Sequence, residues 1–166
     1  MVVTLIVYYI LIYSKSSRDN FPTNYFLLFV FTLGESVSIS FITYNKQPMV
    51  VLEAAVLTLC IALGLTLYAI KTKTDFTMMG GFLFIAGFAF VGAMMLRLVF
   101  HSKTYNLMIE TIGVILFGLY LVFDTQIILG NHWVSFGVDE YILAAMMIYL
   151  DLINIFIELL QILSEK

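Results

Sequence analysis

The sequence YLDLINIFIELL at residues 149–160 places an aspartate, Asp151, inside an apolar run that is typical of a membrane-spanning helix. A second aspartate, Asp124, lies in the equally apolar sequence LYLVFDTQIIL at residues 119–129. An ionisable group at membrane depth is energetically costly, so it needs a partner, a water-filled cavity or a shifted pKa. The two aspartates are therefore the first candidates for a functional site.

The composition places the chain among proteins that cross the membrane several times. Of its 166 residues, 62% are hydrophobic and 11% are charged, and the formal net charge is -3. A soluble domain, by contrast, is about 45–50% apolar. The sequence shows no basic patch for nucleic acid, no cofactor or metal motif and no catalytic constellation, and its single cysteine excludes an internal disulfide. We expect an integral membrane protein that binds lipids, is not an enzyme, and uses neither a cofactor nor a resident metal.

Five apolar segments are long enough to span a bilayer, which takes roughly 20 residues. They cover residues 24–44, 48–70, 78–100, 105–129 and 137–163. Backbone polar groups in lipid must be satisfied within the segment, so each segment should be a helix. The short connections make neighbouring helices antiparallel. The predicted fold is an all-α membrane helix bundle that forms one transmembrane domain over residues 1–166.

The first 13 residues are apolar but too short to span a bilayer. They lack the basic start and the small-residue cleavage site of a signal peptide. We therefore interpret residues 1–13 as a partial helix that stays with the mature chain. Lysines and arginines divide equally between the two sides of the predicted bundle, which leaves its orientation open.

The last span carries a polar seam. Asp151, Asn154 and Glu158 follow one another at steps of three and four residues, so they share one face of a helix. Asp124 shares a face of the preceding span with Glu110 in the same way. By helix rise, however, the two aspartates differ in depth by roughly 10–15 Å. Contact between them would require a helical loop end, a kink or a later helix start.

Acids outnumber bases inside the spans. The six acids are Glu35, Glu53, Glu110, Asp124, Asp151 and Glu158, and the single base is Arg97. Neighbouring acids can share a proton, line the path of a cation, or contact basic residues of another chain. Asp124, Asp151 and Glu35, which lies among serines that can hydrogen-bond it, are favoured for function. Asn154, Glu158 and Glu110 are assigned a supporting polar role, as structural residues or contacts to a partner.

Several motifs together resemble the transmembrane Bax inhibitor motif family, and most closely its Lifeguard branch. They are FTLGES at residues 31–36, VLEAAVLT at 51–58, GLTLY at 64–68, KTDF at 73–76, FDTQ at 123–126, DEYILAA at 139–145 and YLDLINIF at 149–156. The motifs occur in the family's order, and the resemblance extends over residues 24–163.

The resemblance implies a compact bundle of six or seven helices around a central acidic site. It also implies a pH-sensitive calcium leak channel that modulates cell death, with Ca²⁺ as the permeating ion. The family's inward aspartate pair corresponds to Asp124 and Asp151, and its third-helix glutamate corresponds to Glu35. A proton shared by the pair would hold two helices together, and its loss would open the path. Family members reside mostly in the endoplasmic reticulum and Golgi membranes, and one branch is mitochondrial.

The chain departs from the family pattern at its N-terminus. The family's first helix is absent, and residues 1–13 correspond to the end of the second. Glu110 and Glu158 are additions to the usual pattern. We therefore keep an alternative interpretation, in which the chain is a structural accessory subunit without transport activity. It would belong to a large membrane complex, such as one of the mitochondrial inner membrane, whose other subunits fill the place of the missing helix.

Overall fold

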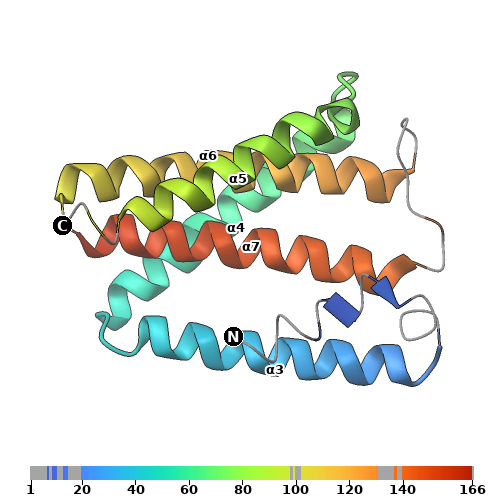
Figure 1. Ribbon diagram of the computed structural model, residues 1–166, viewed down its shortest axis with the longest axis horizontal. Coiled ribbons are helices and arrows are strands. Elements are labelled where there is room, and N and C mark those ends of the chain that lie inside the picture. The colour runs from blue at the N-terminus through green and yellow to red at the C-terminus, as the bar shows by residue number, and fades with distance from the viewer. Residues whose placement is uncertain are drawn as a thin grey trace. The chain divides into compact units, whose positions relative to one another are not determined.

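The computed structural model describes residues 20–97, 102–130 and 140–165, together with residues 7, 9, 10, 13, 14, 99 and 137. Within this part of the chain the fold is helical. The elements are α3 (Thr23–Thr43), α4 (Pro48–Lys71), the 3₁₀ helix η1 (Phe76–Met79), α5 (Gly80–Leu96), α6 (Lys103–Leu129) and α7 (Tyr141–Ser164) (Figure 1). Helices α3, α4, α6 and α7, and η1 continued by α5, are each long and apolar enough to cross a membrane. The all-α fold with five full spans is confirmed, and the chain is an integral membrane protein.

Local residue chemistry sets where the spans begin and end. Pro48 occupies the start of α4, where its missing N–H removes no helical hydrogen bond. Asp75 caps η1, because its carboxylate accepts hydrogen bonds from the backbone N–H and the hydroxyl of Thr77. Gly130 ends α6 with a φ of 72°, a left-handed conformation that glycine adopts without strain. Most of the predicted partial helix at residues 1–13 lies outside the described residues.

The chain divides into two compact units, Met1–Lys46 with Phe136–Met147, and Gln47–Ser135 with Ile148–Lys166. In the first unit, Phe31 is buried and the amide of the buried Asn24 donates a hydrogen bond of 3.1 Å to the hydroxyl of Tyr141. The aromatic rings of Tyr25 and Tyr141 also lie 6.1 Å apart, between their centroids. The prediction of a single domain over residues 1–166 stays a prediction.

Helix α6 is the central element of the second unit. One apolar cluster joins it to α4 and α7 through residues that include Ala54, Leu121 and Ile155. A second joins it to α5 through residues that include Phe90 and Leu116, and α4, α5 and α6 lie together in Figure 1. Burial on two sides makes α6 the natural carrier of buried polar groups in this unit.

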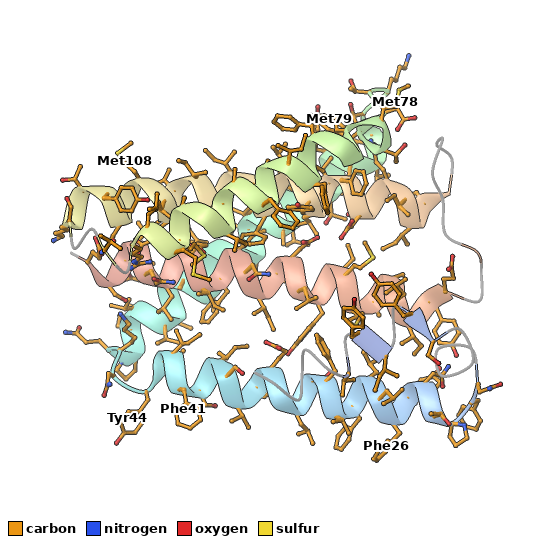
Figure 2. The ribbon with its side chains drawn as sticks, in the orientation of Figure 1. Phe26, Phe41, Tyr44, Met78, Met79 and Met108 are labelled. Carbon is orange, nitrogen blue, oxygen red and sulfur yellow. The ribbon has the colours of Figure 1, made fainter. Side chains whose placement is uncertain are left out.

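Large apolar side chains cover the outer surfaces of the spans. Phe26, Phe41 and Tyr44 extend outward from α3, and Met108 extends outward from α6 (Figure 2). In water such exposure would be costly, whereas in a bilayer these side chains meet lipid. This surface is what an integral membrane protein requires.

Candidate functional site

The two aspartates that the sequence singled out are brought together. Helix α6 carries Asp124 and helix α7 carries Asp151, both within the second unit, and their side chains are only 4% and 6% exposed. The two carboxyl groups lie close enough to interact with each other. The expected depth mismatch is therefore not an obstacle to contact.

The start of α7 explains how the aspartates reach each other. The sequence predicted that this span begins at Gly137, but the α-helix begins at Tyr141. Before it, the N–H of Gly137 donates to a carboxylate oxygen of Glu140 at 3.0 Å, a capping contact that precedes the first helical turn. Asp151 then lies ten residues into α7 and Asp124 five residues before the end of α6. At 1.5 Å per residue the offset falls to about 7–8 Å, which side chains and helix tilt can bridge.

The chemistry of the aspartate pair depends on one proton. An ionised carboxylate only accepts hydrogen bonds, so a bond between two carboxyl groups requires a proton on one of them. The remaining oxygens, Oδ1 of Asp124 and Oδ2 of Asp151, are buried and have no hydrogen-bond partner among the described residues. A pair of this kind can bind one proton, or present unsatisfied oxygens to a cation after the proton leaves.

A buried amide beside the aspartates is a functional residue that the sequence analysis missed. Gln126 is completely buried, two residues after Asp124. Its side-chain oxygen accepts the N–H of Phe76 at 2.7 Å, and its side-chain nitrogen donates to the carbonyl oxygens of Thr74 at 2.9 Å and Ala69 at 3.4 Å. Gln126 thus fastens the connection between α4 and η1 to the end of α6. The signal in the sequence was its place in the FDTQ motif at residues 123–126, next to the apolar residues IIL at 127–129.

A second polar cluster lies where α5 ends and α6 begins. The guanidinium of Arg97 forms an ion pair of 2.8 Å with Glu110, which is fully buried, and donates a hydrogen bond of 2.9 Å to the side-chain oxygen of Gln161 on α7. Glu158 on α7 is 3% exposed and close enough to both Arg97 and Glu110 to interact electrostatically with them. The predicted supporting residues Glu110 and Glu158 therefore gather here, and not around the aspartates.

The remaining predicted residues take different places. The Asn154 amide donates to the carbonyl of Leu150 in the preceding turn of its own helix, at 2.9 Å. Glu35 is half-buried on α3 in the first unit, so its membership of a path that includes the aspartates stays a prediction. The hydroxyls of the nearby Ser36 and Ser38 donate to backbone carbonyls of their own helix.

Comparison with known proteins bears on the whole chain. The family model described as inhibitor of apoptosis-promoting Bax1 matches residues 1–166. Protein lifeguard 4 of Mus musculus is 36% identical over 147 residues, which cover 89% of this chain and 60% of that protein. The Golgi anti-apoptotic protein of Vaccinia virus (strain Lister) is 34% identical with the same coverage. Bax inhibitor 1 of Schizosaccharomyces pombe is 31% identical over 146 residues, covering 87% of this chain and 53% of that protein. The chain therefore spans little more than half of the length of these relatives.

Proposed function

Because the chain belongs to the family of inhibitors of apoptosis-promoting Bax1, we propose that it modulates cell death as a pH-sensitive calcium leak channel, with Asp124 and Asp151 as its proton-linked gate. The observation that carries the proposal is that two buried carboxyl groups on two membrane helices lie close enough to interact with each other. The printed names of the relatives, which include Lifeguard and anti-apoptotic proteins, support the cell-death role. Glu35 is proposed as a third acid of the cation path.

The closed state of the gate is the protonated one. A proton shared by Asp124 and Asp151 joins α6 to α7 through a hydrogen bond and leaves a single charge on the pair. Loss of that proton leaves two negative charges side by side. Two unit charges about 4 Å apart repel each other by about 4 kcal/mol at an effective dielectric constant of about 20. That repulsion favours separation of the two helices at this point.

The open state offers the oxygen ligands that Ca²⁺ prefers. Oδ1 of Asp124 and Oδ2 of Asp151 already have no hydrogen-bond partner among the described residues. Deprotonation adds the two oxygens that were engaged with each other. Ca²⁺ is bound by carboxylate and carbonyl oxygens, and a partial shell from the protein, completed by water, allows the ion to leave again.

The test is calcium flux through liposomes that contain the purified full chain, measured with an enclosed calcium dye between pH 6 and pH 8. Flux should rise with pH in the wild type, because deprotonation opens the path. The variants Asp124→Asn and Asp151→Asn cannot develop the repulsion, so their flux should stay low at alkaline pH, with a loss of about tenfold or more for a lost bias of 1.4 kcal/mol or more.

Glu53→Gln is the matched control, because Glu53 is an acid within a span but exposed on α4. Its flux and pH response should equal those of the wild type. Aspartate variants that keep the wild-type pH response would contradict the gate. A wild-type chain without flux would favour the alternative proposal, in which the aspartate pair joins helices of a structural subunit in a larger complex, and native electrophoresis of solubilised membranes would then show that complex.

The membrane in which the chain resides is part of the proposal. The name of the Golgi anti-apoptotic relative supports the endoplasmic reticulum or Golgi, and the mitochondrial inner membrane is the alternative. Co-localisation of the tagged chain with markers of these organelles decides between them.

A further inference from the structure

The polar cluster around the Arg97–Glu110 ion pair contains a further carboxyl group, that of Glu158, which is not part of the ion pair. Glu158 makes no hydrogen bond to any residue that the structure describes, and its Oε2 atom is fully buried. The side chain lies against Gly113 of α6, where an added Cβ would come within 2.8 Å of the carboxyl carbon of Glu158 and 2.8 Å of Cζ of Phe90. Glycine backbone and an aromatic ring therefore form part of its surroundings, and neither solvates a negative charge.

The charges around Glu158 do not balance. Arg97, the residue directly after α5, contacts Glu110 and Gln161, and α6 contributes Glu110 itself. Helix α4 carries the exposed Glu53 and Lys71, Lys103 is exposed at the start of α6, and Glu165 follows the last residue of α7. Among the residues that the structure describes, the two acids of this cluster, Glu110 and Glu158, lie near one base, Arg97. If both were ionised, the described residues would compensate only one of the two negative charges, and a buried charge without a counter-charge is costly.

We propose that Glu158 is a proton-binding site, separate from the aspartate pair, and that it holds a proton at neutral pH, which neutralises the cluster. A proton suits this place better than a metal cation, because the Arg97 guanidinium beside Glu110 would repel a metal ion. A proton bound to a carboxyl oxygen leaves the ion pair intact and provides an O–H donor. The site lies seven residues, or about 10 Å of helix rise, after Asp151 on α7. The inference does not depend on calcium transport.

The experiment is infrared spectroscopy of the full chain reconstituted in lipid at pH 7, in the band of protonated carboxyl groups. The background is the double variant Asp124→Asn with Asp151→Asn, which removes the signal of the aspartate pair. Adding Glu158→Gln should remove a band equivalent to one carboxyl group. Adding Glu53→Gln, the exposed control, should leave the band unchanged. A band that survives Glu158→Gln at full intensity would overturn the proposal.

A second variant tests the charge balance with Glu158 in place. Glu110→Gln leaves Glu158 as the natural carboxylate partner of Arg97, so Glu158 should ionise and the band should disappear. Persistence of the band in this variant would refute the argument from charge. Size-exclusion profiles and thermal unfolding show whether each variant folds. If Glu158→Gln does not fold, Glu110→Gln decides the question. Since the readout is a carboxyl band, failure of the Glu158 proposal is distinguishable from failure of the channel proposal, which would appear as an absence of calcium flux.

Discussion

Arg97 should be the charged residue whose replacement destabilises the fold most. Its guanidinium is 25% exposed, whereas Glu110, which it contacts at 2.8 Å, is completely buried. Removing one partner of a buried ion pair costs about 3–5 kcal/mol. Partial exposure of Arg97 lowers that figure, and loss of the hydrogen bond to Gln161 adds to it. We expect Arg97→Gln to lower the free energy of unfolding by about 2–4 kcal/mol.

The assay is unfolding of the chain in mixed micelles with increasing sodium dodecyl sulfate, followed by circular dichroism. Arg97→Lys keeps the charge, but a lysine ammonium lacks the planar guanidinium that contacts both Glu110 and Gln161. This variant should lower the free energy of unfolding by about 1–2 kcal/mol. Lys103→Gln is the control, because Lys103 is exposed at the start of α6, and it should stay within about 0.5 kcal/mol of the wild type. A loss under about 0.5 kcal/mol at neutral pH, as for an exposed ion pair, would refute the reasoning.

Three further substitutions test packing and hydrogen bonding in the same assay. Gly113→Ala should lower the free energy of unfolding by about 1–3 kcal/mol, because its Cβ would lie 2.8 Å from the Glu158 carboxyl carbon. Gly92→Ala, with open space around the added Cβ, should leave the free energy of unfolding unchanged or raise it by up to about 1 kcal/mol. Equal effects of the two substitutions would contradict the close approach at Gly113. Gln126→Leu should lose about 2–4 kcal/mol, because it leaves a backbone N–H and carbonyls of the α4–η1 connection without their partner, and a neutral result would mean that water replaces the amide. Tyr141→Phe should cost about 0.5–1.5 kcal/mol through its lost hydrogen bond, and no loss would show that the bond adds nothing to stability.

The spans themselves could be predicted from the sequence, because each is an apolar run of the right length. Their ends could not be predicted to the residue. The third span was expected to reach Phe100, but α5 ends at Leu96, immediately before Arg97 turns to its buried partner. The last span was expected from Gly137, but α7 begins at Tyr141, after the contact between Gly137 and Glu140. Capping depends on side-chain geometry that hydropathy does not contain.

The sequence also identified Asp124 and Asp151, yet not their contact. Their separation in depth depends on where α7 starts and how it tilts, and neither follows from periodicity. In the same way, helical periodicity placed Glu110 and Glu158 on polar faces, but not beside Arg97. That grouping depends on how α5, α6 and α7 cross. The count of six acids against the single base Arg97 inside the spans was a signal that some acid would pair with it, but it did not say which one.

The hydrogen bonds of the Gln126 side chain couple the end of α6 to the connection between α4 and η1. The same side chain is one turn or less from Asp124 and holds the polar connection at residues 72–75, so the end of α6 and that connection must move together. Energetic linkage of this kind is reciprocal. A lipid headgroup or a protein that bound the connection would favour one position of the end of α6. That position would favour the binding by the same free energy. Binding at the connection from the aqueous phase could therefore oppose a movement of α6 inside the bilayer, and such a movement would change the affinity of that binding.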